Sequence, residues 1–218
     1  MNKYVTPSLL NVDAKNRLEL VNKLVDAGIK WIHYDVMDGK FVENTAIEID
    51  EIENIAKNGK KHLKDVHLMV ENPYDYVEKV KNFVDIITFH YESIIDDLDK
   101  FEDFLERNFH EIKIGLAIKP STPVDVLLPY IDRLALVLIM SVEPGKGGQK
   151  FIETSLDKII KLKLYRQKDC LDFLIQVDGG INNITGPKSF KSGADACVAG
   201  TYLVNEPTKE KIHSIIKG

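Results

Sequence analysis

Residues 31–39 read WIHYDVMDG, a short apolar run that ends in an Asp-Gly turn. The run predicts a β-strand over 31–36, in which successive side chains point to opposite faces. His33, Asp35 and Met37 then share one face, and the apolar residues between them share the face that packs beneath helices. An imidazole and a carboxylate on one face can bind a metal ion or a substrate, or can be satisfied by their neighbours. The stretch alone leaves both interpretations open.

Working outward from this strand, the chain alternates between predicted strands and predicted helices. Apolar residues at helical spacing precede it, and Gly28 suits the end of that helix. The expected strands cover residues 4–10, 31–36, 62–70, 85–90, 113–118, 133–140, 172–177 and 194–199. The expected helices cover residues 14–27, 47–57, 73–83, 94–109, 123–130, 155–168, 184–191 and 208–216.

Eight strand–helix pairs in 218 residues predict parallel strands joined by helical crossovers. We therefore expect a single-domain (β/α)8 TIM barrel over residues 1–218, with a doubly wound open sheet as the alternative. The unbroken apolar run over 134–140 is typical of a strand buried on both faces. No linker or low-complexity segment divides the chain.

Composition argues against several classes of protein. The net charge is −5 and no basic run occurs, so a nucleic-acid partner is not expected. Cys170 and Cys197 form no CxxC pair, which disfavours a disulfide scaffold or a thiolate metal site. Neither a signal-peptide pattern nor an apolar stretch of membrane-spanning length is present. We expect a cytoplasmic protein without a membrane partner.

Polar residues gather where the expected strands end, which is where barrels of this kind place their active sites. They are Ser8, His33, Asp35, His67, His90, Ser141, Asp178 and Thr201. Four of them alternate onto the inward faces of three strands: His33, Asp35, His67 and Asp178. Two imidazoles and two carboxylates suit one divalent ion such as Zn²⁺, Fe²⁺, Mn²⁺ or Co²⁺. The alternative is that each is a polar strand end satisfied by backbone or water.

Glycine-rich loops follow the last three strands. They read EPGKGGQ over 143–149, DGG over 178–180 and AGT over 199–201. Each taken alone is more often a turn, but three on adjacent strands predict a phosphate-binding cradle. Met37, Met69 and Met140 also stand at strand ends, where they either fill the core or cap the metal with a soft apolar layer.

Together these motifs resemble the ribulose-phosphate 3-epimerase family. The resemblance rests on HYDVMDGKFV at 33–42, DVHLM at 65–69, PGKGGQ at 144–149 and VDGG at 177–180, with TPS at 6–8 and AGT at 199–201. It spans essentially the whole chain. It implies a metal-dependent (β/α)8 barrel of the pentose phosphate pathway that interconverts D-ribulose 5-phosphate and D-xylulose 5-phosphate.

The resemblance also implies roles for individual residues. His33, Asp35, His67 and Asp178 match the family's metal ligands, and Asp35 and Asp178 match its two acid–base residues. Substrate-contacting positions match Ser8, His67, Gly145, Lys146, Gly147, Gly148, Asp178, Gly179, Gly180, Gly200 and Thr201. The expected partner is a small sugar phosphate. Because barrels often associate through their helical faces, a homo-oligomer is also expected.

The sequence departs from the family's commonest pattern in two loops. Lys146 stands where an aromatic residue is usual, and Lys40 and Glu43 replace a frequent His and Pro. These changes bear on substrate preference and rate. The nearest alternative function is a D-allulose 6-phosphate 3-epimerase. A decarboxylase or isomerase on another phosphate-binding barrel, and a non-catalytic sugar-phosphate-binding barrel, are the others.

Overall fold

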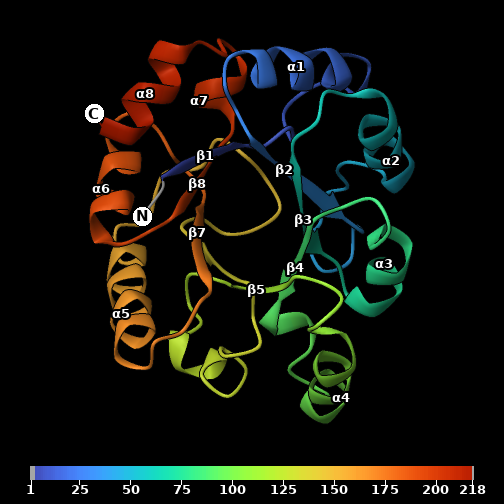
Figure 1. Cartoon of the computed structure of the whole chain (residues 1–218), viewed down its shortest axis with the longest axis vertical. Coiled ribbons are helices and arrows are strands. Elements are labelled where there is room, and N and C mark those ends of the chain that lie inside the picture. The colour runs from blue at the N-terminus through green and yellow to red at the C-terminus, as the bar shows by residue number, and fades with distance from the viewer. Residues whose placement is uncertain (1–2, 218) are drawn as a thin grey trace.

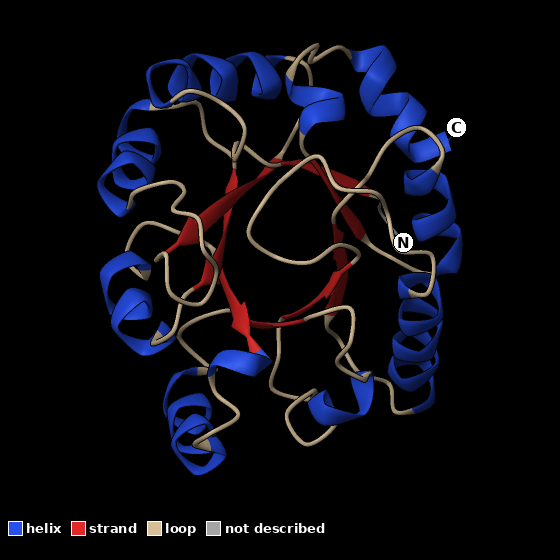
Figure 2. Ribbon diagram, turned by 180° about the vertical axis from the view of Figure 1, so that it is seen from behind, coloured by secondary structure: helices blue, strands red, loops and turns tan. Residues whose placement is uncertain are grey.

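A ring of eight parallel strands surrounded by helices forms the centre of the computed structural model, which describes residues 3–217 (Figures 1 and 2). The strands are β1 (Tyr4–Pro7), β2 (Trp31–Met37), β3 (Leu63–Met69), β4 (Ile86–His90), β5 (Ile114–Ile118), β6 (Leu136–Met140), β7 (Leu174–Asp178) and β8 (Ala196–Ala199). Strands adjacent in sequence pair in parallel from β2 to β8, and β8 pairs with β1. A bridge between Ser8 and His33 closes the ring. The predicted TIM barrel is confirmed, and the open doubly wound sheet is wrong.

Helices pack around this ring (Figure 2). They are α1 (Ala14–Asp26), α2 (Ile49–Asn58), α3 (Pro73–Val80), α4 (Leu98–Asn108), α5 (Ser155–Lys168), α6 (Thr185–Ser192), α7 (Thr201–Val204) and α8 (Lys209–Lys217), with 3₁₀ turns η1 (Tyr91–Ser93) and η2 (Val124–Leu127). The short α7 was not expected from the sequence. Within residues 3–217, no helix has both the length and the apolar character needed to cross a membrane.

Two helix predictions need correction. The helix expected over 94–109 begins only at Leu98, because the Asp97 side chain accepts a hydrogen bond from the Lys100 amide at 3.1 Å and caps the first turn. The helix expected over 123–130 is only the 3₁₀ turn η2. Pro129 lies inside that range and lacks the amide donor that a continuing helix would use.

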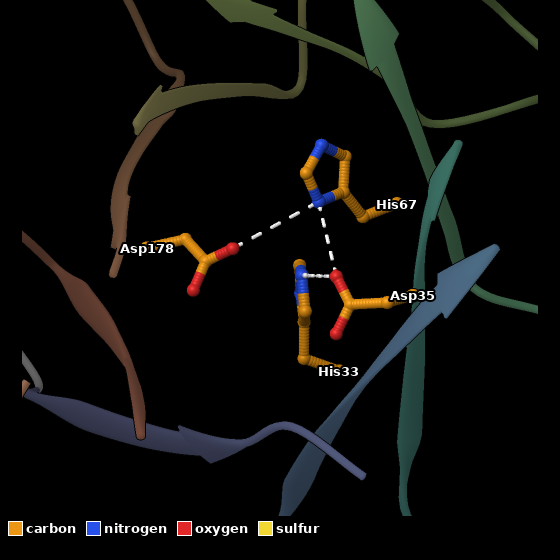
Figure 3. A group of neighbouring side chains, drawn as sticks. All are labelled: His33, Asp35, His67 and Asp178. Carbon is orange, nitrogen blue, oxygen red and sulfur yellow. Dashed lines mark hydrogen bonds and ion pairs between the residues drawn. The ribbon is translucent and has the colours of Figure 1, made fainter. Parts of the chain in front are cut away.

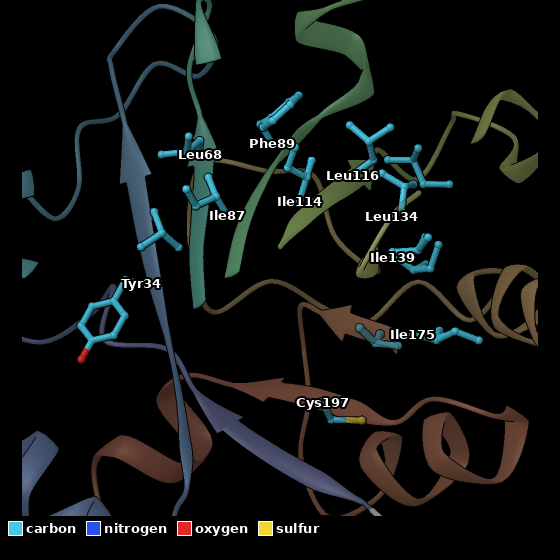
Figure 4. Packing of buried hydrophobic residues seen from close by; sticks show 14 of the residues in the cluster. Tyr34, Leu68, Ile87, Phe89, Ile114, Leu116, Leu134, Ile139, Ile175 and Cys197 are labelled. Carbon is cyan, nitrogen blue, oxygen red and sulfur yellow. The ribbon is translucent and has the colours of Figure 1, made fainter. Parts of the chain in front are cut away.

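The two faces of each strand have different surroundings, as the period of two predicts. Outward side chains pack against the helices in one continuous apolar layer (Figure 4), which includes Tyr34, Leu68, Phe89, Leu116 and Ile139. Inward side chains near the amino ends of the strands form a separate apolar plug of Trp31, Ile86, Leu136, Leu138 and their neighbours. Above this plug the interior becomes polar, with His33, Asp65, His67, Thr88 and Gln176 all buried.

A buried ion pair joins α5 to β7 and β8. The guanidinium of Arg166 contacts the carboxylate of Asp195, with Nη1 and Oδ2 2.5 Å apart, and also donates to the carbonyl of Phe173 at 2.8 Å. Asp195 Oδ2 further accepts from the Ile175 amide at 2.9 Å. Both side chains of the pair are less than a tenth exposed. One carboxylate therefore ties a helix to the starts of two strands.

Asp195→Ala is expected to lower the free energy of unfolding by about 3–5 kcal/mol, because it removes the carboxylate that balances a buried guanidinium. Urea unfolding followed by circular dichroism measures this. Asp125→Ala is the matched control, since its carboxylate pairs with Lys161 on an exposed surface and should leave the midpoint nearly unchanged. Equal midpoints for Asp195→Ala and the native protein would contradict the prediction.

Candidate functional site

Four side chains point toward one another inside the barrel (Figure 3). His33 and Asp35 come from β2, His67 from β3 and Asp178 from the end of β7. Their ligand atoms all lie within 4.8 Å of one another. Asp35 and His67 are direct partners in the β2–β3 register, which sets their side chains next to each other. The predicted convergence of these four residues is confirmed, and the cluster could hold a metal ion.

His33 is oriented by a second carboxylate beneath the cluster. Its Nδ1 lies 2.8 Å from Asp65 Oδ2, and that same oxygen accepts from Gln176 Nε2 at 2.8 Å. The other ring nitrogen, Nε2, is buried, makes no hydrogen bond among the described residues and lies 3.4 Å from Asp35 Oδ1. A buried ring nitrogen in this position, with its opposite nitrogen bonded to a carboxylate, is the usual arrangement of a metal-binding histidine.

His67 presents its Nδ1 atom to the same point. This atom lies 3.3 Å from Asp35 Oδ1 and 3.9 Å from Asp178 Oδ2. On the far side of the ring, Nε2 lies 3.0 Å from Nε2 of His90. Ser8 donates its hydroxyl proton to the second oxygen of Asp35 at 2.5 Å, so this carboxylate is held from two sides. Of the two aspartates only Asp178 has appreciable exposure, at 19% of its side chain.

The two carboxylates have pKa values shifted in opposite directions. Burial opposes ionisation of Asp35, but the positive charge of His33 and the neighbouring His67 ring outweigh it and hold the Asp35 pKa well below its usual range. Burial and the charge of Asp35 raise the pKa of Asp178 to about 6. Below about pH 6 the pair therefore holds one ionised and one protonated carboxyl group, and this separation of the two pKa values suits acid–base catalysis by two carboxylates.

The cluster attracts positive charge. Burial disfavours the charged form of His33, yet the carboxylates of Asp65 and Asp35 overcome this and raise the His33 pKa well above its usual value. A divalent ion would supply that positive charge in exchange for the proton, because an imidazole must be deprotonated to act as a ligand. The donor set and the unbonded Nε2 atom of His33 thus fit a divalent ion.

A cavity of about 420 Å³ opens above the cluster, within the range of small-molecule sites. Asp35, Asp178 and Ser8 contribute to its lining, whereas the rings of His33 and His67 lie beneath it. Met37, Met69 and Met140 also line the cavity while remaining almost fully buried. The three methionines therefore form an apolar wall beside the two carboxylates, at the shared level that their strand-end positions predict.

The glycine-rich loops also line this cavity. They contribute Gly145, Lys146, Gly147, Gly148, Gly179, Gly180, Gly200 and Thr201. Four of these positions cannot carry a side chain without movement, since a Cβ on Gly145, Gly147, Gly179 or Gly180 would lie less than 3.0 Å from another atom. At Gly180 that atom is the Phe151 amide nitrogen, 2.6 Å away. Gly180 also has a φ of +63°, which other residues rarely adopt. The loops are thus packed closely enough to bring backbone amides near a bound anion.

The family model described as Ribulose-phosphate 3 epimerase family matches residues 4–204 of this chain. The chain belongs to the ribulose-phosphate 3-epimerase family. The prediction of an epimerase of this family is confirmed, and the cluster and cavity described above are the candidate active site of one of its members.

Relatives named Ribulose-phosphate 3-epimerase come from distant organisms. The Bacillus subtilis protein is 37% identical over 216 residues, covering 98% of this chain and 98% of its own length. The Schizosaccharomyces pombe protein is 34% identical over 214 residues, covering 96% of this chain and 90% of its own. A rice protein named as the cytoplasmic isoform is 34% identical over 217 residues, covering 98% and 92%. The similarity extends over nearly the full length of each protein.

Some residues around this epimerase-family site were not assigned a role from sequence. Asp65 and Gln176 stand two residues before His67 and Asp178, so the period of two already places them on the inward face. His90 was noted only as a polar strand end, and Glu92 not at all. Ser141, also noted there, donates its hydroxyl to the backbone carbonyls of Asp178 and Gly179 at 2.8 and 2.7 Å. It therefore holds the end of β7 in place.

Proposed function

We propose that this chain interconverts D-ribulose 5-phosphate and D-xylulose 5-phosphate, with one divalent ion held by His33, Asp35, His67 and Asp178. The observation that carries the proposal is the convergence of Asp35 and Asp178, from β2 and β7, on one buried cluster below the cavity. Their opposite pKa shifts supply an acid and a base in the same site.

Epimerisation at C3 removes a proton from one face of the sugar and returns one to the other face. Asp35, held ionised by two histidines, is suited to take the proton, and Asp178, whose higher pKa of about 6 makes it the more basic of the two carboxylates, is suited to carry and return one. In the reverse direction the two exchange roles. The Ser8 hydroxyl fixes the orientation of the Asp35 carboxylate during either step. A bound divalent ion would stabilise the negative charge that develops on the C2 and C3 oxygens as the proton leaves.

The loops fix the sugar in register with the two carboxylates. We assign the phosphate to the cavity-lining glycines Gly147, Gly148, Gly179, Gly180 and Gly200, where the absence of a side chain lets an anion approach the backbone amides. Lys146 and Thr201, in the same lining, are proposed to contact the substrate as well. The methionine wall excludes water from the reacting carbon, which strengthens electrostatic interactions there.

Several finer expectations remain part of this proposal. The ion is Zn²⁺, Fe²⁺, Mn²⁺ or Co²⁺, as a mixed imidazole and carboxylate donor set favours. The reaction belongs to the pentose phosphate pathway, and residues 1–218 form one domain. A cytoplasmic location agrees with the name of the rice relative. A homo-oligomer without nucleic-acid or membrane partners stays a prediction.

Turnover on two sugar phosphates in D₂O tests this function. We expect at least about tenfold higher kcat/KM for D-ribulose 5-phosphate than for D-allulose 6-phosphate, since one extra hydroxymethylene group must fit the same cavity. Deuterium should appear at C3 of the product. Unphosphorylated D-ribulose is the control and should turn over poorly. A preference for the hexulose phosphate would support the alternative epimerase, and no turnover of either by metal-loaded protein would support a non-catalytic binder.

A further inference from the structure

His90 connects the candidate metal centre to a carboxylate outside it. Its ring is completely buried at the end of β4 and does not line the cavity. Its Nε2 lies 3.0 Å from Nε2 of His67, and its Nδ1 lies 3.1 Å from Oε2 of Glu92. The three side chains thus form a relay that reaches His67 from the side opposite the cluster.

The hydrogen bonds to Glu92 Oε1, the oxygen that does not face His90, determine which atoms donate and which accept along this relay. Its Oε1 accepts from the Lys119 backbone amide at 2.8 Å and from the Thr122 hydroxyl. A backbone amide can only donate, and an ionised carboxylate can only accept. Although burial opposes ionisation, the hydrogen bonds from His90, Thr122 and Lys119 lower the Glu92 pKa to about 2. Oε2 therefore accepts a hydrogen bond from the Nδ1–H group of His90, and in a neutral ring the lone pair is then on His90 Nε2.

The same rule, that each hydrogen bond needs one donor and one acceptor, applies between His90 and His67. Because His90 Nε2 carries a lone pair, His67 Nε2 must carry the proton shared between the two rings. The remaining nitrogen of His67, Nδ1, lies 3.3 Å from Asp35 Oδ1 and 3.9 Å from Asp178 Oδ2, and in a neutral ring it carries the lone pair that a bound ion would take. We propose that His90 and Glu92 are positioning residues that fix the tautomer of His67, so that its Nδ1 is available to a divalent ion. This inference rests on the proposed metal-binding function.

The two histidine rings of the relay are completely buried. The Phe41 ring covers His90 with ring centres 4.8 Å apart, and the Lys119 ammonium lies 4.5 Å from the Phe41 ring centre. Water therefore does not compete for the ring nitrogens of His90, and their partners are set by the protein. The two ligand histidines are oriented by different routes, since a carboxylate contacts His33 directly and Glu92 reaches His67 only through His90.

Glu92→Gln tests the direction of the relay. The amide oxygen should stay with the Lys119 amide, so that the NH₂ group faces His90 and donates where the carboxylate accepted. The proton order along both rings then reverses and places a proton on His67 Nδ1. We expect the Kd for Zn²⁺, titrated into metal-free protein, to rise about 10- to 100-fold. In ¹⁵N NMR spectra of the metal-free variant, His67 should change from the Nε2–H to the Nδ1–H tautomer.

Two variants serve as controls. Thr122→Val removes one donor to Glu92 without changing the direction of the relay, and Glu43→Gln removes the same charge from an exposed loop residue. Both should keep the native Zn²⁺ affinity and the native tautomer. Native affinity in Glu92→Gln would overturn the positioning role.

NMR of the unmodified, metal-free protein tests the relay without any variant. An Nδ1–H tautomer of His67 at about pH 8, where an ordinary histidine is neutral, would overturn the relay even if every variant misfolded. A native protein that fails to bind Zn²⁺ would instead refute the proposed metal site, and the tautomer would still decide whether the relay exists.

Discussion

Asp178→Asn is expected to abolish epimerisation, with kcat falling by about 10²–10⁴-fold, the range for loss of one general acid–base group. The amide cannot return a proton to the second face of the sugar, and its shape preserves the packing at the end of β7. Asp35 remains able to remove a proton from one of the two epimers. We therefore expect this variant to exchange the C3 hydrogen of one epimer with D₂O while forming almost none of the other.

The design separates proton transfer from metal binding, because Asp178 is proposed to serve both. Metal content of the variant is measured by elemental analysis, and the exchange is measured on metal-loaded protein. Asp38→Asn is the matched control, since that carboxylate follows the end of β2 and accepts hydrogen bonds from the backbone amides of Lys40, Phe41 and Glu71. It should retain turnover within a few-fold of native. Full turnover in folded, metal-loaded Asp178→Asn would refute the two-carboxylate scheme.

Removal of divalent metal is expected to stop turnover and to lower the thermal stability of the protein. Prolonged chelation leaves two carboxylates close together without the cation proposed to balance them. A ligand that binds only the folded state at 100 times its Kd stabilises it by about 2.7 kcal/mol, so Tm should fall when the ion is removed. Adding Zn²⁺, Mn²⁺, Fe²⁺ or Co²⁺ should restore both turnover and Tm.

Two controls make this result specific. Protein dialysed without chelator should keep its activity, and Mg²⁺ should restore turnover poorly, because it prefers oxygen ligands and octahedral geometry to imidazole. The metal is quantified by elemental analysis at each step. Undiminished turnover by protein that contains no metal would contradict the proposed role of the four ligands.

Local patterns in the sequence were sufficient to predict much of the fold. The alternation of eight apolar strands with amphipathic helices predicted the barrel, and α5 was placed at its observed bounds. Predictions failed where short-range chemistry competed with helical spacing, at the cap formed by Asp97 and before Pro129. Apolar periodicity does not distinguish a full helix from a 3₁₀ turn when a proline interrupts it.

The sequence by itself determined which side chains face the interior, because a strand alternates its side chains whatever surrounds it. That was enough to bring His33, Asp35, His67 and Asp178 together and to place the glycine loops beside them. Only the tertiary structure decided the partners of these residues. The register that sets His33 opposite Asp65, and the contact between His67 and His90, join segments more than 20 residues apart. The opposite pKa shifts of Asp35 and Asp178 likewise arise from burial and from charges brought near through space, which strand periodicity does not encode.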